Sequence, residues 1–85
     1  MTQPLLAAVL DGQIVVLDTH QARVMVLDPR SERIWRACAG VLEDAIATSM
    51  GEPAPRVLST LRDLAEAGLV SLERGRWRQA PVRWI

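Results

Sequence analysis

The sequence contains no lysine, tyrosine or phenylalanine, and it has a single cysteine and a single histidine. These shortages remove most of the groups that act in catalysis or hold metal ions. A metal site needs several His, Cys or carboxylate ligands at defined spacing, and no such spacing is visible. The five glycines, at positions 12, 40, 51, 68 and 75, lie too far apart for a phosphate-binding loop. We therefore expect a non-enzymatic protein that needs no metal and no other cofactor.

The lone Cys38 cannot form an internal disulfide, which fits a reducing cytoplasm. It falls in a predicted helix beside apolar neighbours, where a free cysteine acts as a small hydrophobic side chain. The lone His20 falls in a predicted turn, where we expect it to be solvated. No segment reaches the roughly 18 apolar residues of a membrane span. We expect a cytoplasmic protein without a membrane partner.

Length and charge indicate how many domains the protein has and which kinds of partner it attracts. A chain of 85 residues predicts one domain over residues 1–85, with little room for a deep catalytic cleft. Ten arginines balance ten acidic residues, so net charge gives no general attraction to nucleic acid or membrane. The charge is unevenly placed, however, because residues 71–85 hold four arginines and one acidic residue. This basic end is either a solvated hairpin or a tail that docks on an acidic partner.

The first third of the chain predicts three short strands, over residues 5–10, 13–18 and 23–27. Asp11-Gly12 between the first two is a strong hairpin signal, since both residues tolerate positive φ. The third strand is rich in β-branched residues and leads directly into a helix. We expect it to lie at a sheet edge.

The remainder predicts three helices and a last hairpin. Asp28 can cap a helix whose first residue is Pro29, with Ser31 as a rival cap. Ile34, Trp35 and Cys38 recur at helical spacing before Gly40, and we expect Trp35 to be a core residue packed against the sheet. A second helix is expected from Val41 to Met50 and a third from about Arg56 to Ala67, with Gly68 as its stop. Residues 69–79 predict a hairpin turning at Arg74-Gly75, and residues 80–85 an irregular tail.

These elements predict an α+β, winged-helix-like fold: a three-stranded antiparallel N-terminal sheet, three helices and a C-terminal hairpin extension over residues 70–85. Three segments resemble a known family: residues 11–18, the run Val26-Leu27-Asp28-Pro29 followed by Arg33-Ile34-Trp35, and residues 57–70 ending in Gly68-Leu69-Val70. Together they are similar to the PqqD-like recognition elements of ribosomally made, modified peptides (RiPPs). Asp28 stands where that family usually has Asn. The resemblance covers residues 8–70, and the hairpin that follows goes beyond the usual family ending.

The resemblance implies a protein that binds the leader of a precursor peptide and has no activity of its own. Stand-alone members of this length are similar to the small leader-binding proteins of lasso peptide clusters, which deliver the precursor to a separate leader peptidase. In that family the leader adds as a strand beside the third strand and lies against the third helix, and the resemblance implies the same arrangement here. The implied peptide-binding residues are Arg23, Val24, Met25, Val26, Leu27, Asp28, Val57, Thr60, Leu61 and Leu64.

Side-chain alternation divides the third strand into two faces. Val24 and Val26 share one face, and Met25 and Leu27 share the other. Leu27 matches the core leucine of the family, so the resemblance implies that Met25 and Leu27 point inward. A peptide paired with this strand would depend on backbone groups. We therefore expect specificity to come from the third helix, although its apolar face, Leu61 and Leu64 above all, also fits a core role.

A winged-helix DNA-binding regulator is the alternative. Residues 58–70 resemble a recognition helix, and Arg74, Arg76 and Arg78 would suit a wing that touches phosphates. Against this, the helix mixes Asp63 and Glu66 with its arginines, and the chain as a whole lacks the basic footprint of a DNA reader. We expect peptide rather than nucleic acid to be the partner.

Overall fold

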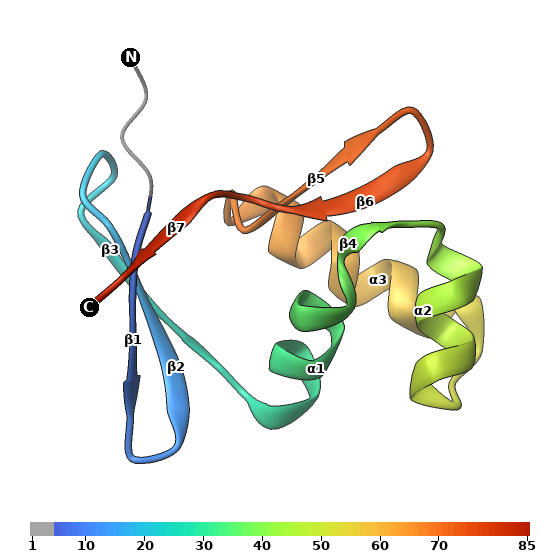
Figure 1. Cartoon of the computed structure of the whole chain (residues 1–85), viewed down its shortest axis with the longest axis horizontal. Coiled ribbons are helices and arrows are strands. Elements are labelled where there is room, and N and C mark those ends of the chain that lie inside the picture. Colours follow the sequence, from blue (N-terminus) through green and yellow to red (C-terminus); the bar gives the residue numbers. More distant parts are fainter. Residues whose placement is uncertain (1–4) are drawn as a thin grey trace. The chain divides into compact units, whose positions relative to one another are not determined.

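The structure is a computed structural model that describes residues 5–85. It is an α+β protein whose chain forms two compact units (Figure 1). One unit comprises the chain up to Glu32 together with Pro81–Ile85, and the other comprises Arg33–Ala80. Each unit has a sheet of its own.

The first unit is built on the predicted meander. Strands β1 (Leu5–Leu10), β2 (Gln13–Asp18) and β3 (Arg23–Leu27) pair antiparallel in sequence order. Asp11 and Gly12 both have positive φ, 52° and 77°, as a tight two-residue hairpin turn requires. The three predicted strands and their hairpin are thus confirmed.

The tail forms a strand that the sequence did not predict. Residues 80–85 were expected to be irregular, but β7 (Val82–Trp84) pairs in parallel with β1. The N–H of Leu5 donates to the carbonyl of Pro81, and that of Ile85 donates to Ala7. The N-terminal sheet therefore has four strands in the order β3-β2-β1-β7.

One face of this sheet carries the buried side chains. Its register places Ala7 opposite Val16 and Ile14 opposite Leu27, and all four are buried. We call this the inner face. Along β2 the burial alternates strictly, as expected for a sheet covered on one side.

Helix α1 (Pro29–Ala37) begins where the sequence predicts. Asp28 is its N-cap, because the N–H of Ser31 donates to Asp28 Oδ1 at 2.7 Å. Proline suits the first helical position, where no backbone donor is needed. Ile34 and Trp35 are buried, so the core role predicted for Trp35 is confirmed.

The segment after α1 differs from the prediction. Val41 and Leu42 were expected to open the second helix, but Val41 ends a short strand, β4 (Ala39–Val41), and α2 runs over Glu43–Met50. Leu42 is the extended residue before α2. Both residues are apolar, and an apolar run alone does not distinguish a short strand from a helix start.

Helix α3 (Ala54–Glu66) starts two residues before the predicted Arg56, with Pro55 in its first turn. Proline is tolerated there because first-turn N–H groups have no helical partner. Gly68, with φ of 78°, follows the helix, and the N–H of Leu69 donates to the carbonyl of Leu64. This is the glycine-terminated helix end that the sequence predicts.

Strands β5 (Val70–Glu73) and β6 (Arg76–Gln79) form the predicted hairpin, and β4 joins it in the order β4-β6-β5. The core of this unit contains the following buried side chains: Ile34, Trp35, Cys38, Ile46, Ala47, Val57, Leu61, Leu64, Leu69, Val70 and Trp77. No helix in residues 5–85 is long and apolar enough to cross a membrane.

Candidate functional site

The predicted peptide-binding strand, β3, lies at an edge of the N-terminal sheet. It pairs with β2 on one side, and no described strand pairs with its other side. The expected edge position is confirmed. An edge strand presents backbone N–H and C=O groups to which another chain can add.

The two faces of β3 differ in exposure as expected. Leu27 is buried and Met25 is half-buried on the inner face, opposite Ile14 and Val16. Val24 and Val26 point to the other face and are 66% and 56% exposed. Valine side chains this exposed on a strand are available to a further strand laid alongside.

An aspartate organises the turn that leads into β3. Asp18 Oδ1 accepts hydrogen bonds from the N–H groups of His20 and Gln21, at 3.0 and 3.2 Å. Its other oxygen lies 3.6 Å from Arg23 Nη2 at the start of β3. Asp18 is buried, so its carboxylate is compensated by these donors rather than by water. The beginning of the edge strand is therefore held by its own hairpin.

Asp28 holds the other end of the strand. It follows Leu27 directly and caps α1 through Ser31. Hydrogen bonds from the backbone and then the side chain of Ser31, with the nearby charge of Arg30, lower the pKa of Asp28 below its usual 3.8. Asp28 is ionised at neutral pH and is engaged in the cap.

The four helix residues of the predicted site lie on α3, in the other unit. Val57, Leu61 and Leu64 are buried, at 0%, 0% and 5% exposed. Thr60 is half-buried, and its hydroxyl donates to the carbonyl of Arg56 at 3.5 Å. The core role that the sequence allowed for Leu61 and Leu64 is the one they have here, and Val57 shares it.

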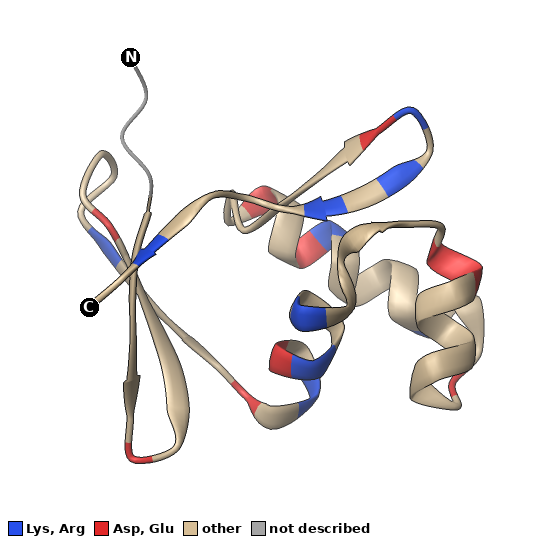
Figure 2. Ribbon diagram, in the orientation of Figure 1, with Lys and Arg blue, Asp and Glu red and all other residues tan. Residues whose placement is uncertain are grey.

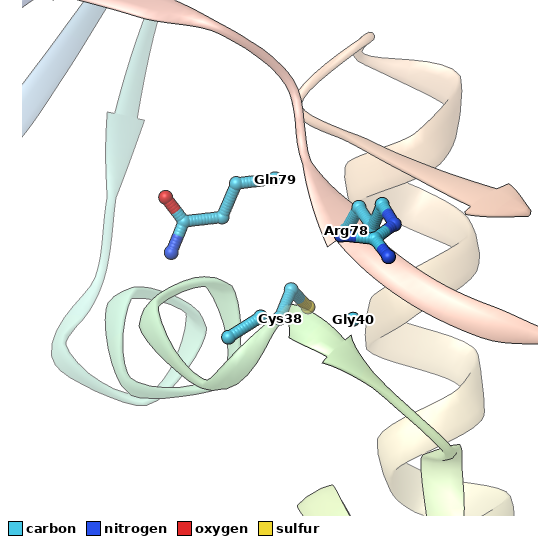
Figure 3. A pocket seen from close by; sticks show the side chains of 5 residues that line it. Cys38, Gly40, Arg78 and Gln79 are labelled. Carbon is cyan, nitrogen blue, oxygen red and sulfur yellow. The ribbon is translucent and has the colours of Figure 1, made fainter.

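The structure also forms a pocket that the sequence did not predict, lined by Cys38, Ala39, Gly40, Arg78 and Gln79 (Figure 3). Ala39 and Val41 face the consecutive residues Arg78 and Trp77, so Gly40 is the extra residue of a β-bulge. Its φ of 78° favours glycine, and an added Cβ would lie 3.0 Å from Arg78 Nη1. From the sequence, Gly40 was interpreted as the residue that ends a helix. Its role in the bulge depends on Arg78, 38 positions later in the chain, so the residues around Gly40 do not predict it.

The charged and nucleophilic groups of this pocket are already engaged. Arg78 Nε lies 3.3 Å from Glu73 Oε2, and the carbonyl of Gly40 accepts a hydrogen bond at 3.3 Å from Nη1 of Arg76, which does not line the pocket. The Cys38 thiol donates to the carbonyl of Ile34, and burial raises its pKa to about 11. Cys38 is thus a protonated thiol at neutral pH, whereas a nucleophilic cysteine needs a lowered pKa.

Among residues 5–85, no group of three or more His, Cys, Asp or Glu side chains is placed to hold a metal ion. No family model matches the chain, and comparisons with curated proteins and with solved structures likewise find no match.

Proposed function

We propose that this protein binds the leader of a ribosomally made precursor peptide by strand addition at β3. It would present the bound precursor to a separate processing enzyme, such as a leader peptidase, in cytoplasmic lasso peptide or similar RiPP biosynthesis. The observation that carries the proposal is the open edge of β3. Backbone pairing at such an edge supplies affinity for an extended peptide.

The character of this edge supports the proposal. Proteins usually blunt exposed edges with prolines, charges in the strand centre, bulges or short length. β3 has none of these: its central residues are Val24, Met25 and Val26, and its five pairs with β2 run without a register shift. Its one charged residue, Arg23, is terminal.

The other edges of the two described sheets are less suitable for strand addition. β7 and β4 have three residues each, and β4 is interrupted by the bulge at Gly40. β5 has four residues and ends on Glu73. β3 is therefore the longest regular edge, and Asp18 and Asp28 hold its two ends. A strand organised before binding loses less entropy when a peptide pairs with it.

The proposal is tested by titrating the full chain with the leader of the precursor encoded beside its gene. We expect a sub-micromolar to micromolar Kd, or a binding free energy of about −8 kcal/mol or somewhat stronger. Backbone amide shifts should centre on residues 23–28. Shifts confined to the first hairpin or to residues 74–78 would contradict strand addition at β3.

DNA binding remains the second candidate, because one observation favours it. The second unit orders its elements as helix, strand, two helices and hairpin, with β4 joined to that hairpin, which is a winged-helix arrangement. The wing, β5–β6, carries Arg74, Arg76 and Arg78 (Figure 2). Yet Arg78 pairs with Glu73, and Arg76 bonds the backbone of Gly40. Binding of duplex DNA at physiological salt, without affinity for the leader, would establish this candidate instead.

A further inference from the structure

The face of the N-terminal sheet opposite its buried side is apolar at almost every position. We call it the outer face; the register assigns it Leu6, Ala8, Leu10, Gln13, Val15, Leu17, Val24, Val26 and Arg83, and Ile85 when the pairing of β7 is extended by one residue. Gln13 and Arg83 are its only polar members. In Figure 2 the charged residues of β1, β2 and β3 lie only near the ends of these strands.

Two apolar rows cross this face and end at the open edge. Leu6, Leu17 and Val24 are successive cross-strand neighbours, and so are Ala8, Val15 and Val26. Each row ends on a valine that has a cross-strand neighbour on β2 and none on its other side among the described strands. The outer faces of most half-covered sheets are polar, so this pattern calls for an apolar partner.

The predicted site residues on α3 do not offer exposed apolar side chains to a bound peptide. Val57, Thr60, Leu61 and Leu64 were expected to give a bound peptide its specificity, but the three apolar side chains are buried, and Thr60 is half-buried and bonded to the helix backbone. Val24 and Val26 are the site residues whose apolar side chains are most exposed. The source of specificity therefore moves from the helix to the edge strand itself.

We propose that Val24 and Val26 select an extended peptide segment that carries two apolar side chains, two residues apart. When the peptide pairs with β3, one of these side chains lies beside Val24 and the other beside Val26, so that each apolar row is extended by one side chain. The inference rests on the proposed strand addition at β3. A strand paired with β3 places the residues opposite Val24 and Val26 on the outer face, whether it runs parallel or antiparallel. β-branched or aromatic side chains fit best, because such cross-strand pairs are the favourable ones.

Charge also defines the segment. No charged side chain lies on the outer face of β2 or β3, and Arg83 lies across the sheet on β7. A charged residue opposite either valine would lose water and gain no partner. The selected pair should therefore exclude Asp, Glu, Lys and Arg.

The experiment selects displayed linear peptides of about ten residues on the immobilised full chain, and then measures their Kd and the amide shifts that they cause. Peptides that shift residues 23–28 should share two apolar positions separated by one residue. The double variant Val24→Thr/Val26→Thr keeps side-chain shape and should bind them about 10-fold more weakly. Val9→Thr is the matched control, since Val9 is 57% exposed but lies on β1, and it should bind as the wild type does.

A second arm changes the peptide and leaves the protein intact. Serine at either apolar position of the peptide should weaken its binding to the wild-type protein. The same serine substitution should cause a smaller loss of affinity for the double threonine variant. Peptides that shift β3 yet bind both proteins equally would overturn this inference and leave strand addition standing. If no selected peptide shifts β3, the proposed function fails as well.

Discussion

The indole Nε1 of Trp35 donates a hydrogen bond to the backbone carbonyl of Leu69 at 3.0 Å, across 34 positions of sequence. The same carbonyl accepts the N–H of Ala80 at 2.8 Å. One buried acceptor thus joins the middle of α1, the residue before β5 and the residue after β6. This arrangement fixes the base of the β5–β6 hairpin.

Replacing Trp35 should therefore cost much of the stability of the second unit. Trp35→Ala creates a large cavity and should lower the free energy of unfolding by about 3–5 kcal/mol. Trp35→Phe should cost less, because Leu69 keeps the hydrogen bond from Ala80 and part of the ring volume is retained. Urea unfolding followed by circular dichroism measures both. Leu72→Ala is the control: this side chain is 56% exposed on β5, and a comparable loss there would contradict a specific role for Trp35.

The cap at Asp28 gives a prediction with a pH dependence. Asp28→Ala should cost about 0.5–2 kcal/mol, because Ser31 loses its acceptor. The pKa of Asp28 is lower in the folded state, so its ionic contribution is complete above about pH 4 and is lost as the pH falls through the folded value. Asp28→Asn keeps an acceptor but does not titrate. The stability advantage of the wild type over Asp28→Asn should shrink only in acid, and a difference that grows below the usual pKa would have the wrong sign.

Proline scanning of β3 tests which backbone groups serve the open edge. Successive residues of an antiparallel strand direct their N–H groups to opposite sides, so Val24→Pro and Val26→Pro should behave alike and Met25→Pro oppositely. Variants that lose an N–H bonded to β2 should melt at lower temperature. Variants that lose an open-edge N–H should keep their melting temperature and lose leader binding. Equal effects of all three would show that β3 does not pair regularly.

A charge at Leu64 distinguishes a core residue from a residue that lines a groove. Leu64 is 5% exposed, so we expect Leu64→Glu to abolish cooperative unfolding or to cost more than about 3 kcal/mol. Arg62→Glu, on an exposed position of the same helix, should fold normally. A folded Leu64→Glu protein that binds leader weakly would instead restore Leu64 to the binding surface.

Local signals were sufficient for much of this fold. Asp11-Gly12 predicts its hairpin because the turn requires two positive φ values. Asp28-Pro29 predicts a helix start because Asp28 accepts a hydrogen bond from a first-turn N–H, and Gly68 predicts a helix end because glycine readily adopts the positive φ found there. Alternation along β3 predicted which of its side chains share a face. Each of these features depends on neighbours in sequence.

Only the tertiary structure decided the features that depend on distant partners. β4 and β7 are only three residues long. β4 is a strand because it pairs with β6, and β7 is a strand because it pairs with β1, so the local sequence does not predict either of them. The apolar stripe of α3 predicted a helix, but which neighbours cover Val57, Leu61 and Leu64 is settled by packing. The exposure of Val24 and Val26 likewise follows from the register with β2, which places them on the outer face, and from the position of β3 at the end of the sheet, where no further described strand flanks them.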